Sequence, residues 1–443
     1  MNGAFPRGFT WGISTSSYQI EGAVAVDGRG PSIWDVFCRQ PGRVANGDTG
    51  DVACDHYHRY GEDVSLMQRL GVQAYRFSVS WPRVLPSGAG APNEPGISFY
   101  DRLVDALLEA GIEPWLCLYH WDLPQALQER GGWTNRAIAG WFADYADLVA
   151  RRLGDRVKRF ATFNEPSIFT LFGYAFGLHA PGSHDAERLH AAIHHVNLAH
   201  GAAVDALRSR VGGAEIGCIH TMQPCRPASP APQDRAAAET IDLFWNHAFP
   251  DPQVLAVYPE RLRALVAPFF QEGDLERIAR KVDWLGINHY SPVYAKGVWG
   301  APLGFAFGDA PPEMPRSPIG WPIDPSAFHD TLVSAHERYK LPIYVLENGL
   351  GAIEKPVDGS RIDDAARIDY LRGYVEAMRK ALSSGADVRG YFVWSLLDNF
   401  EWQAGYAQRF GVVYVDYATQ RRIPKASAEW YAKLIRTERG KVP

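Results

Sequence analysis

The sequence predicts an α/β protein built as a single (β/α)8 TIM barrel, a closed ring of eight parallel strands surrounded by helices. Eight short apolar segments recur along the 443 residues, and amphipathic helical segments fill the gaps between them. Alternating strands and helices form parallel sheets covered by helices, and eight such units close a barrel. Because a barrel with insertions can fill more than about 400 residues, we expect one domain over residues 1–443.

The expected strands are short and rich in Val, Ile, Phe, Tyr and Trp, which favour extended backbone. In chain order they are Phe9–Ser14, Ala74–Trp81, Glu113–Trp121, Arg159–Glu165, Ala214–Thr221, Val282–Tyr290, Pro342–Glu347 and Val388–Ser395. Their continuous apolar character is typical of strands that are buried on both faces of a sheet.

Helical patterns separate these strands. Residues 99–111 and 367–385 carry apolar side chains at spacings of three and four, and each segment ends at a glycine suited to a C-terminal cap. Residues 141–155 show the same pattern before the fourth strand. Two segments rich in proline and glycine, residues 21–50 and 296–325, interrupt the alternation, and we expect them to be loop insertions at the rim of the barrel.

Composition excludes several classes of protein. The chain has 45 Lys and Arg against 50 Asp and Glu, so it lacks the basic excess of a nucleic-acid-binding protein. No apolar run reaches about 18 residues, the length that predicts a membrane span. The start of the chain lacks the features of a signal peptide, and the five scattered cysteines are typical of reduced thiols. We therefore expect a cytoplasmic protein with no nucleic-acid or membrane partner.

Polar residues stand at the ends of five expected strands. They are His120-Trp121-Asp122 after the third strand, Asn164-Glu165 after the fourth, Asn288-His289-Tyr290 after the sixth, Glu347-Asn348 after the seventh, and Trp394-Ser395 with residues 398–402 after the eighth. The carboxyl ends of barrel strands meet around one opening, where the active sites of such barrels lie. Stability alone does not explain polar residues at five strand ends.

Two carboxylates stand out among these residues. Glu165 and Glu347 belong to expected strands four and seven, which face each other across an eight-stranded barrel. Two opposed carboxyl groups perform glycoside hydrolysis: one protonates the leaving oxygen, and the other attacks the anomeric carbon or activates water. Alternatively, each glutamate is a rim carboxylate paired with an arginine. The 12% aromatic content, part of it at the same opening, favours the first interpretation because sugar rings stack on flat side chains.

These motifs resemble those of the family 1 glycoside hydrolases, the β-glucosidase family. The resemblance rests on Thr162-Phe163-Asn164-Glu165-Pro166, Glu347-Asn348-Gly349 and residues 394–402, together with FTWGISTSSYQIEGA and SIWDVF, and it extends over essentially the whole chain. It implies a retaining, exo-acting β-glucosidase that cleaves terminal, non-phosphorylated β-D-glucosyl residues and needs no metal or other cofactor. Expected substrates are small β-glucosides and short β-linked oligosaccharides such as cellobiose. Action on β-galactosides or β-fucosides and transglycosylation are also implied.

Carried over residue by residue, the resemblance makes Glu165 the general acid/base and Glu347 the nucleophile of a double displacement, with carboxyl groups about 5–5.5 Å apart. Glu165 must be protonated in the first step, so we expect its surroundings to raise its pKa. Arg76, near the end of the second strand, is the cation expected beside Glu347. Tyr290 is expected to donate its hydroxyl group to the same carboxylate.

The resemblance also implies which side chains hold the sugar. Those expected to bind the terminal sugar are Gln19, His120, Asn164, Asn288, Tyr290, Trp394, Glu401 and Trp402, with Trp121 and Trp321 in support. Because the Glu401 carboxylate would repel a phosphate group, we expect a neutral sugar. On the leaving-group side, the expected residues are Trp321 and Trp133 as stacking surfaces, and Ser167, Ile168, Phe172 and His179 around the next subsite.

Two other functions remain open: a sugar-binding barrel without turnover and a metal-dependent hydrolase. The intact pair Glu165 and Glu347 argues against the first, because a binding protein has no need for two opposed carboxylates. The segment LHAAIHHVNLAH contains His190, His194, His195 and His200 but no HExxH glutamate, and we expect these histidines on a helix packed against the barrel. His289 is expected to point away from the sugar, because alternate strand residues face opposite ways.

Overall fold

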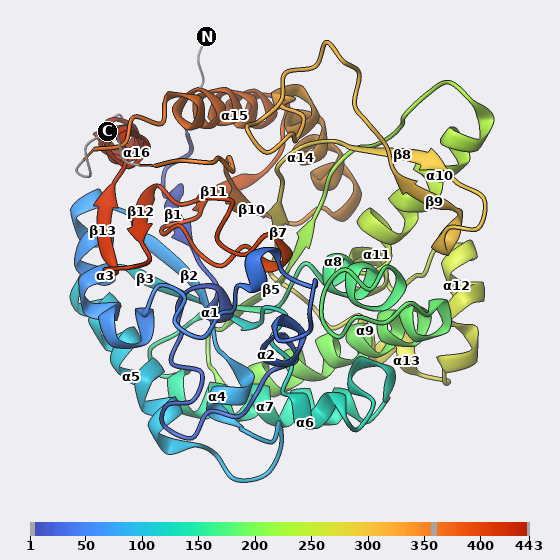
Figure 1. Ribbon diagram of the computed structural model, residues 1–443. Coiled ribbons are helices and arrows are strands. Elements are labelled where there is room, and N and C mark those ends of the chain that lie inside the picture. Colours follow the sequence, from blue (N-terminus) through green and yellow to red (C-terminus); the bar gives the residue numbers. More distant parts are fainter. Residues whose placement is uncertain (1–4, 356–360, 441–443) are drawn as a thin grey trace.

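The computed structural model describes residues 5–355 and 361–440. Eight parallel strands close into a barrel in the order β1-β11-β10-β7-β5-β4-β3-β2 (Figure 1). They are β1 (Thr10–Ser14), β2 (Ala74–Ser78), β3 (Glu113–Tyr119), β4 (Arg159–Asn164), β5 (Glu215–Thr221), β7 (Trp284–Asn288), β10 (Ile343–Asn348) and β11 (Val388–Trp394). The barrel is therefore confirmed. Several expected strands run past the observed ends, because the chain turns there into the loops that carry the polar residues.

The longer helices surround the barrel in Figure 1. They are α3 (His56–Leu70), α5 (Glu94–Glu109), α7 (Ile138–Leu153), α9 (Ala186–Arg210), α14 (Pro325–Tyr339), α15 (Ala365–Ser383) and α16 (Ala426–Gly440). The helices expected over residues 99–111, 141–155 and 367–385 correspond to α5, α7 and α15. None of the described helices has both the length and the apolar character needed to cross a membrane.

Shorter elements lie in the loops. The helices are α1 (Ser17–Ile20), α2 (Ile33–Cys38), α4 (Trp81–Val84), α6 (Gln125–Gln128), α8 (Pro166–Thr170), α10 (Pro232–Asp242), α11 (Pro250–Leu255), α12 (Glu260–Val266) and α13 (Asp274–Ile278). The strands are β6 (Cys225–Pro227), β8 (Val293–Gly297), β9 (Phe305–Phe307), β12 (Val413–Asp416) and β13 (Arg421–Pro424). β8 and β9 form a hairpin that extends outside the barrel in Figure 1.

Large side chains fill the inside of the barrel. Trp115 packs against Trp284, Tyr344 and Phe392, with ring centroids between 4.8 and 5.5 Å apart. Trp284 and Tyr344 stand at the beginning of their strands, so this cluster closes the amino-terminal end of the barrel. Gly12 faces the same cluster, and a Cβ there would lie 2.3 Å from the Phe392 ring, which explains the absence of a side chain. Open space remains at the carboxyl ends of the strands.

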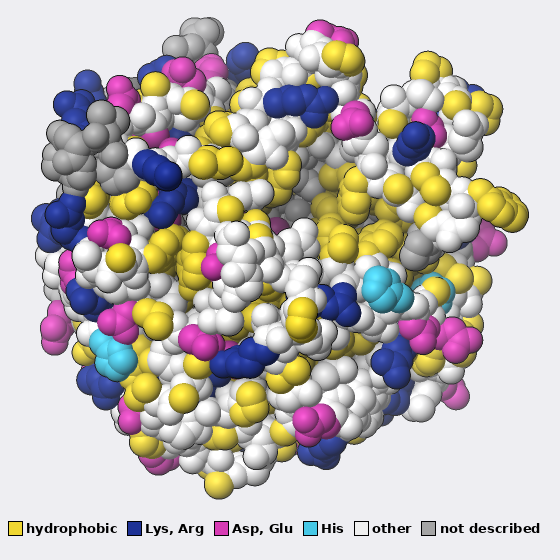
Figure 2. All heavy atoms as spheres, in the orientation of Figure 1, with side chains coloured by type: hydrophobic (Ala, Val, Ile, Leu, Met, Phe, Trp, Pro, Cys, Tyr) yellow, Lys and Arg dark blue, Asp and Glu magenta, His cyan; other side chains and the backbone are white. Residues whose placement is uncertain are grey.

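Two segments outside the barrel border this open end. Within residues 21–50, Trp34 of α2 packs against Trp402, with ring centroids 4.6 Å apart. Within residues 296–325, Phe307 of β9 packs against Phe172, with centroids 5.6 Å apart. Figure 2 shows that the face on this side is hollowed near its centre and that hydrophobic side chains gather along the side of the hollow nearest the β8–β9 hairpin.

A buried ion network fastens the start of α16 to the loop after β11. The Lys425 Nζ atom donates to Asp398 Oδ1 at 2.8 Å and also to Glu354. Arg409 donates to the other carboxylate oxygen of Asp398 at 2.7 Å. Lys425 and Asp398 are both fully buried. Because residues 398–402 carry the polar side chains at this strand end, the network helps to hold that loop in place.

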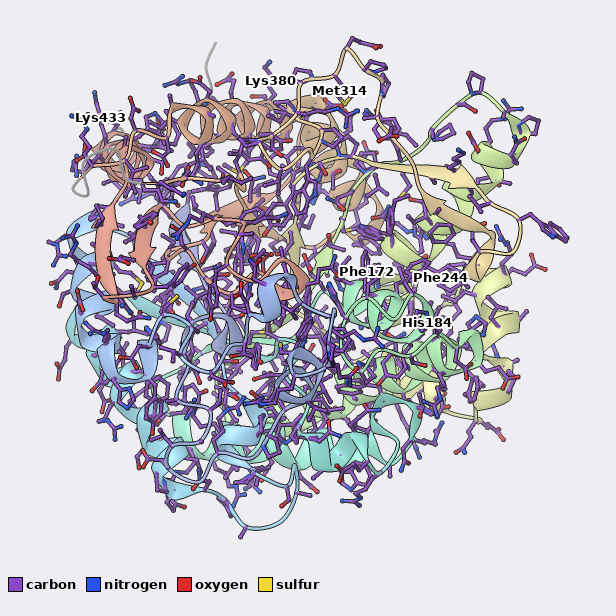
Figure 3. All side chains as sticks on the ribbon, in the orientation of Figure 1. Phe172, His184, Phe244, Met314, Lys380 and Lys433 are labelled. Atoms are coloured by element: carbon purple, nitrogen blue, oxygen red, sulfur yellow. The ribbon has the colours of Figure 1, made fainter. Side chains whose placement is uncertain are left out.

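Replacing Lys425 by methionine is expected to destabilise the protein by about 2–3 kcal/mol, because the buried Asp398 keeps only Arg409 as a cation and the half-buried Glu354 keeps only Arg367. Urea denaturation measures the change in the free energy of unfolding. Lys433→Met is the matched control, since Lys433 (labelled in Figure 3) is an exposed residue of α16 and its replacement should change stability by less than about 0.5 kcal/mol. Equal effects of the two substitutions would contradict this account of the network.

Candidate active site

A cavity of about 560 Å³ opens at the carboxyl ends of the barrel strands. Glu165 and Glu347 both line it and are both buried. The other predicted site residues in its lining are His120, Trp121, Tyr290, Trp321, Trp394, Glu401 and Trp402. The remaining predicted residues, Gln19, Arg76, Asn164 and Asn288, lie behind this lining and contact it through hydrogen bonds. The two carboxylates thus meet in one cavity, but β4 and β10 are not directly opposite as expected, because only β5 and β7 separate them on one side of the ring.

Glu347, near the end of β10, is held from both sides. Arg76 of β2 donates to Glu347 Oε1, and the Tyr290 hydroxyl donates to Glu347 Oε2 at 2.6 Å, so both expected contacts are present. The same guanidinium group lies within 3.1 Å of His120 Nδ1 and 5.5 Å from the centre of the Trp394 ring. A guanidinium group beside a carboxylate compensates its charge, and the two contacts fix the orientation of the carboxyl group.

Glu165 directly follows β4 and is held by two asparagines. Asn288 Nδ2 donates to Glu165 Oε1 at 2.9 Å and to Asn164 Oδ1 at 3.0 Å. Burial, and after it the negative charge of Glu347, raises the pKa of Glu165 to about 8, although the hydrogen bond from Asn288 opposes the shift. The expected rise in this pKa is therefore confirmed, and at neutral pH the carboxyl group of Glu165 carries a proton.

Three residues of the cavity have a left-handed backbone. The φ angles are 47° at Glu165, 78° at Trp121 and 52° at Trp402. Side chains other than glycine rarely adopt this region, and residues held there cluster at functional sites, where surrounding structure enforces the conformation. The Trp121 and Trp402 rings lie 4.5 Å apart, and the Trp121 indole donates to the Asn164 carbonyl at 2.9 Å. The left-handed turns thus bring these side chains into one wall.

The titration of Glu165 has a consequence for stability. Between the ordinary pKa of a glutamate, about 4.3, and the raised value, the folded state keeps a proton that the unfolded state releases. The free energy of unfolding therefore falls as the pH rises from about 4.5 to about 8. Glu165→Gln removes this dependence, so we expect its Tm to exceed that of the wild type by about 2 °C or more at pH 8, with no such gain at pH 4.

Thermal denaturation at both pH values measures this difference. Glu429→Gln is the control, because Glu429 is an exposed residue of α16. A Tm gain of the same size at pH 4 and pH 8 would mean that the substitution stabilises the protein through packing. It would then not act by removing the pH-dependent protonation of Glu165.

Glu401 and Gln19 form the far side of the cavity, after β11 and β1. Gln19 Nε2 donates to the Asn399 side chain and the Phe400 carbonyl, both at 3.0 Å, and lies 3.4 Å from Glu401 Oε2. Burial, and then the charge of Glu347, raises the pKa of Glu401 to about 8. This side of the cavity therefore presents adjacent carboxyl and amide groups, which suit a row of neighbouring hydroxyl groups.

The expectations for the leaving-group side are partly wrong. Trp133 is 1% exposed and packs against Phe163 and Phe142, while its indole donates to the Tyr119 hydroxyl. It lies in the core behind the barrel wall, because its segment turns inward toward α7. Trp321 is 40% exposed and lines the cavity as expected. Ile168, Phe172 and His179 line it too, and Ser167 is buried and absent from the lining.

The other histidines have structural partners. His289 Nδ1 lies 2.8 Å from the Met222 carbonyl and its ring packs against Phe328, so it points away from the cavity as expected. The histidine-rich segment lies on α9. There, His194 contacts Asp274 at 2.8 Å, His195 the Trp133 carbonyl at 3.1 Å, and His200 the Thr162 hydroxyl at 2.8 Å. These contacts place the helix against the barrel.

Sequence reasoning missed several residues of the outer cavity. They are Thr221, Gln223, Trp245, Tyr294, Phe307, Arg316 and Phe410. Most belong to the connection between β5 and β7 or to the β8–β9 hairpin and the loop after it, where no motif marks them. Phe172, labelled in Figure 3, follows α8 and packs against Trp245 and Phe307, so these three rings form one aromatic surface of the outer cavity. The sequence pattern that could have predicted part of this outer cavity is the pair of alternating aromatic residues Phe305 and Phe307.

Comparisons with known proteins agree with this geometry. The model of glycosyl hydrolase family 1 matches residues 1–440. Beta-glucosidase A of Thermotoga maritima is 44% identical over 437 residues, which are 98% of each chain. The bifunctional beta-D-glucosidase/beta-D-fucosidase of Bifidobacterium breve is 43% identical over 97% of this chain and 98% of its own.

Among solved structures, the beta-glucosidase from Thermotoga maritima in complex with glucoimidazole superposes with a TM-score of 0.93. It is 43% identical in sequence, and the match covers 98% of this chain and 99% of that chain. The same beta-glucosidase in complex with deoxynojirimycin gives the same TM-score at 44% identity.

Proposed function

Since the chain belongs to glycosyl hydrolase family 1, we propose that it is a retaining, exo-acting β-glucosidase with Glu165 as general acid/base and Glu347 as nucleophile. The observation that carries this proposal is the meeting of the two buried carboxyl groups in one cavity, with Glu347 fixed by Arg76 and Tyr290. A protonated carboxyl group and a charge-compensated carboxylate are the two partners that double displacement requires.

In the first step, Glu347 attacks the anomeric carbon while Glu165 gives its proton to the leaving oxygen. The tyrosine hydroxyl and the guanidinium group hold the attacking carboxylate in place. Once Glu347 is esterified, its negative charge is gone, and the pKa of Glu165 falls. Glu165 then accepts a proton from water as the water attacks the same carbon from the side that the leaving group vacated, and the bond between that carbon and Glu347 breaks, which restores the Glu347 carboxylate. The product keeps the β configuration.

The terminal sugar binds in the inner part of the cavity, beside Glu165 and Glu347. The proposed contacts are Gln19, His120, Asn164, Asn288, Tyr290, Trp394, Glu401 and Trp402, with Trp121 supporting the aromatic wall. Gln19 and Glu401 each offer two hydrogen-bonding atoms to adjacent hydroxyl groups. Among the described residues, no lysine or arginine hydrogen-bonds to Gln19 or Glu401, so a phosphate group bound beside them would lack a cation, which supports a neutral sugar as the substrate.

The relatives and the cysteine chemistry support a proposed substrate range and location. The relative named beta-D-glucosidase/beta-D-fucosidase supports activity on β-fucosides as well as β-glucosides. We place β-linked disaccharides such as cellobiose among the substrates, and transglycosylation among the reactions when a sugar replaces water. All five cysteines are free thiols, which supports a cytoplasmic location. The proposed catalytic unit is the single domain 1–443, with the rim insertions near 21–50 and 296–325 bordering the cavity.

Release of phenol from a panel of phenyl β-D-glycosides tests the function, with EDTA present throughout. We expect the glucoside, galactoside and fucoside to be hydrolysed and the 6-phosphoglucoside to be a poor substrate. Hydrolysis of the 6-phosphoglucoside in preference to the neutral glucoside would contradict the assignment of a neutral sugar, and no turnover of any member would favour a binding function.

A further inference from the structure

Gln223 lies in the outer part of the cavity, on the side opposite Gln19. β5 ends at Thr221, which pairs with Asn288, and Gln223 follows two residues later, less than about 7 Å further toward the rim. In the strand order, β5 lies directly across the barrel from β1, whose loop carries Gln19, and next to β4, which carries Glu165. Because Glu165 protonates the leaving oxygen, Gln223 stands on the leaving-group side.

Three hydrogen bonds from one short helical segment hold this glutamine. The Gln223 N–H donates to Asn246 Oδ1 at 3.1 Å, and Asn246 Nδ2 donates back to the Gln223 carbonyl at 2.8 Å. The Trp245 indole N–H donates to Gln223 Oε1 at 3.0 Å. Both partners belong to the π-helical segment Leu243–His247, and such single π turns occur frequently at functional sites.

The indole determines which way the amide points. An indole N–H can only donate, so the oxygen of Gln223 must face Trp245 and the NH2 group must face elsewhere. Gln223 is 7% exposed, and its Nε2 atom has no hydrogen-bond partner among the described residues. Since Gln223 lines the cavity and its Nε2 atom is not one of the fully buried unpartnered atoms, this donor is accessible from the cavity and free to bind an acceptor oxygen there.

Aromatic rings stand beside this donor. Phe172 lies 6.3 Å from the Trp245 ring and 5.6 Å from the Phe307 ring, with the two phenylalanine rings inclined by 25°. This part of the cavity therefore offers a flat apolar surface next to one oriented amide donor. A pyranose ring has both matching features, because its C–H faces are apolar and its hydroxyl oxygens accept hydrogen bonds.

We propose that Gln223 recognises a second sugar as the leaving group, by donating its amide N–H to a hydroxyl oxygen of that sugar, and that Trp245 is the positioning residue that aims the amide. This proposal rests on the proposed β-glucosidase function. It makes Gln223 a specificity-determining residue that distinguishes a sugar leaving group from an apolar one. A phenol leaving group has no hydrogen-bond acceptor other than the oxygen of the scissile bond. Its binding is therefore not strengthened by the Gln223 amide.

Kinetics on cellobiose and on phenyl β-D-glucoside test the proposal. Gln223→Met and Gln223→Leu both remove the donor, together with the oxygen that accepts from Trp245, at similar size. We expect each variant to lower kcat/KM for cellobiose by about 3- to 10-fold while kcat/KM for the phenyl glucoside stays unchanged. Trp245→Phe, which frees the amide, should reproduce the selective loss, and combining it with Gln223→Met should add little.

The control is Gln253→Met, since Gln253 is a buried glutamine of α11 outside the cavity lining. It should leave the ratio of the two kcat/KM values at the wild-type value. Equal losses on both substrates, or an unchanged ratio in Gln223→Met and Gln223→Leu, would overturn the proposal while leaving the β-glucosidase function intact. A wild type that hydrolyses neither glucoside would overturn the proposed function, and this proposal with it.

Discussion

Replacing Glu347 by alanine is expected to abolish turnover, lowering kcat on phenyl β-D-glucoside by roughly 10⁴-fold or more. The covalent intermediate cannot form without the carboxylate, and Arg76 and Tyr290 then face an empty space where the attacking group stood. Initial-rate measurements at pH 6 with EDTA present provide the comparison. Glu429→Ala, at an exposed position of α16, serves as the control and should keep wild-type activity.

A small external anion distinguishes the nucleophile from a merely supporting carboxylate. Azide fits the space left by the shortened side chain and can attack the anomeric carbon from the same side as Glu347. We expect azide to restore cleavage in Glu347→Ala when the leaving group is a good one, such as dinitrophenolate, and to yield the α-glucosyl azide because a single displacement inverts the carbon. Formation of the β-glucosyl azide would assign Glu347 to the acid/base role instead.

Replacing Glu165 by glutamine is expected to lower kcat/KM by about 10² to 10⁴-fold for leaving groups that need a proton, such as a sugar or an aliphatic alcohol. Dinitrophenolate leaves without protonation, so kcat/KM for its glucoside should fall far less. The raised pKa of Glu165 also gives the wild type an alkaline limit, because activity is lost as the pH rises through about 8 and the acid loses its proton.

The pH profile of kcat/KM with a substrate that needs protonation therefore provides a second readout. The alkaline limit near pH 8 should be present in the wild type and in Glu429→Gln and absent from Glu165→Gln. Equal losses on all leaving groups, or an unchanged alkaline limit in Glu165→Gln, would show that another group supplies the proton.

The barrel could be predicted from sequence because its signals are local. Each strand is a short apolar run bounded by turns, and each covering helix has its own periodicity, so no knowledge of distant contacts is needed. The strand ends were less predictable. The expected second strand ends at Trp81, whereas β2 ends at Ser78 and Trp81 starts α4, because an apolar residue in a buried loop cannot be told from one in a strand.

Sequence motifs predicted the residues of the inner part of the site, but no motif predicted those of the outer part. Glu165 and Glu347 occupy strand ends whose positions the fold fixes. Trp245 and Phe307, in contrast, reach the cavity from a π-helical segment and a hairpin, whose placement depends on tertiary packing. The same limit explains the error at Trp133: a tryptophan after a strand can face the opening or the core, and only packing decides.

The central claim is that Glu347 forms a covalent bond to the sugar, and trapping that bond tests it most directly. In dinitrophenyl 2-deoxy-2-fluoro-β-glucoside, the fluorine slows both steps by withdrawing electrons from the cationic transition state, while the good leaving group restores the first step. The intermediate should accumulate, and mass spectrometry should show one fluoroglucosyl group per chain, on the peptide that contains Glu347. A label on Glu165 or on any other residue, or hydrolysis of phenyl glucoside with no label, would contradict the account.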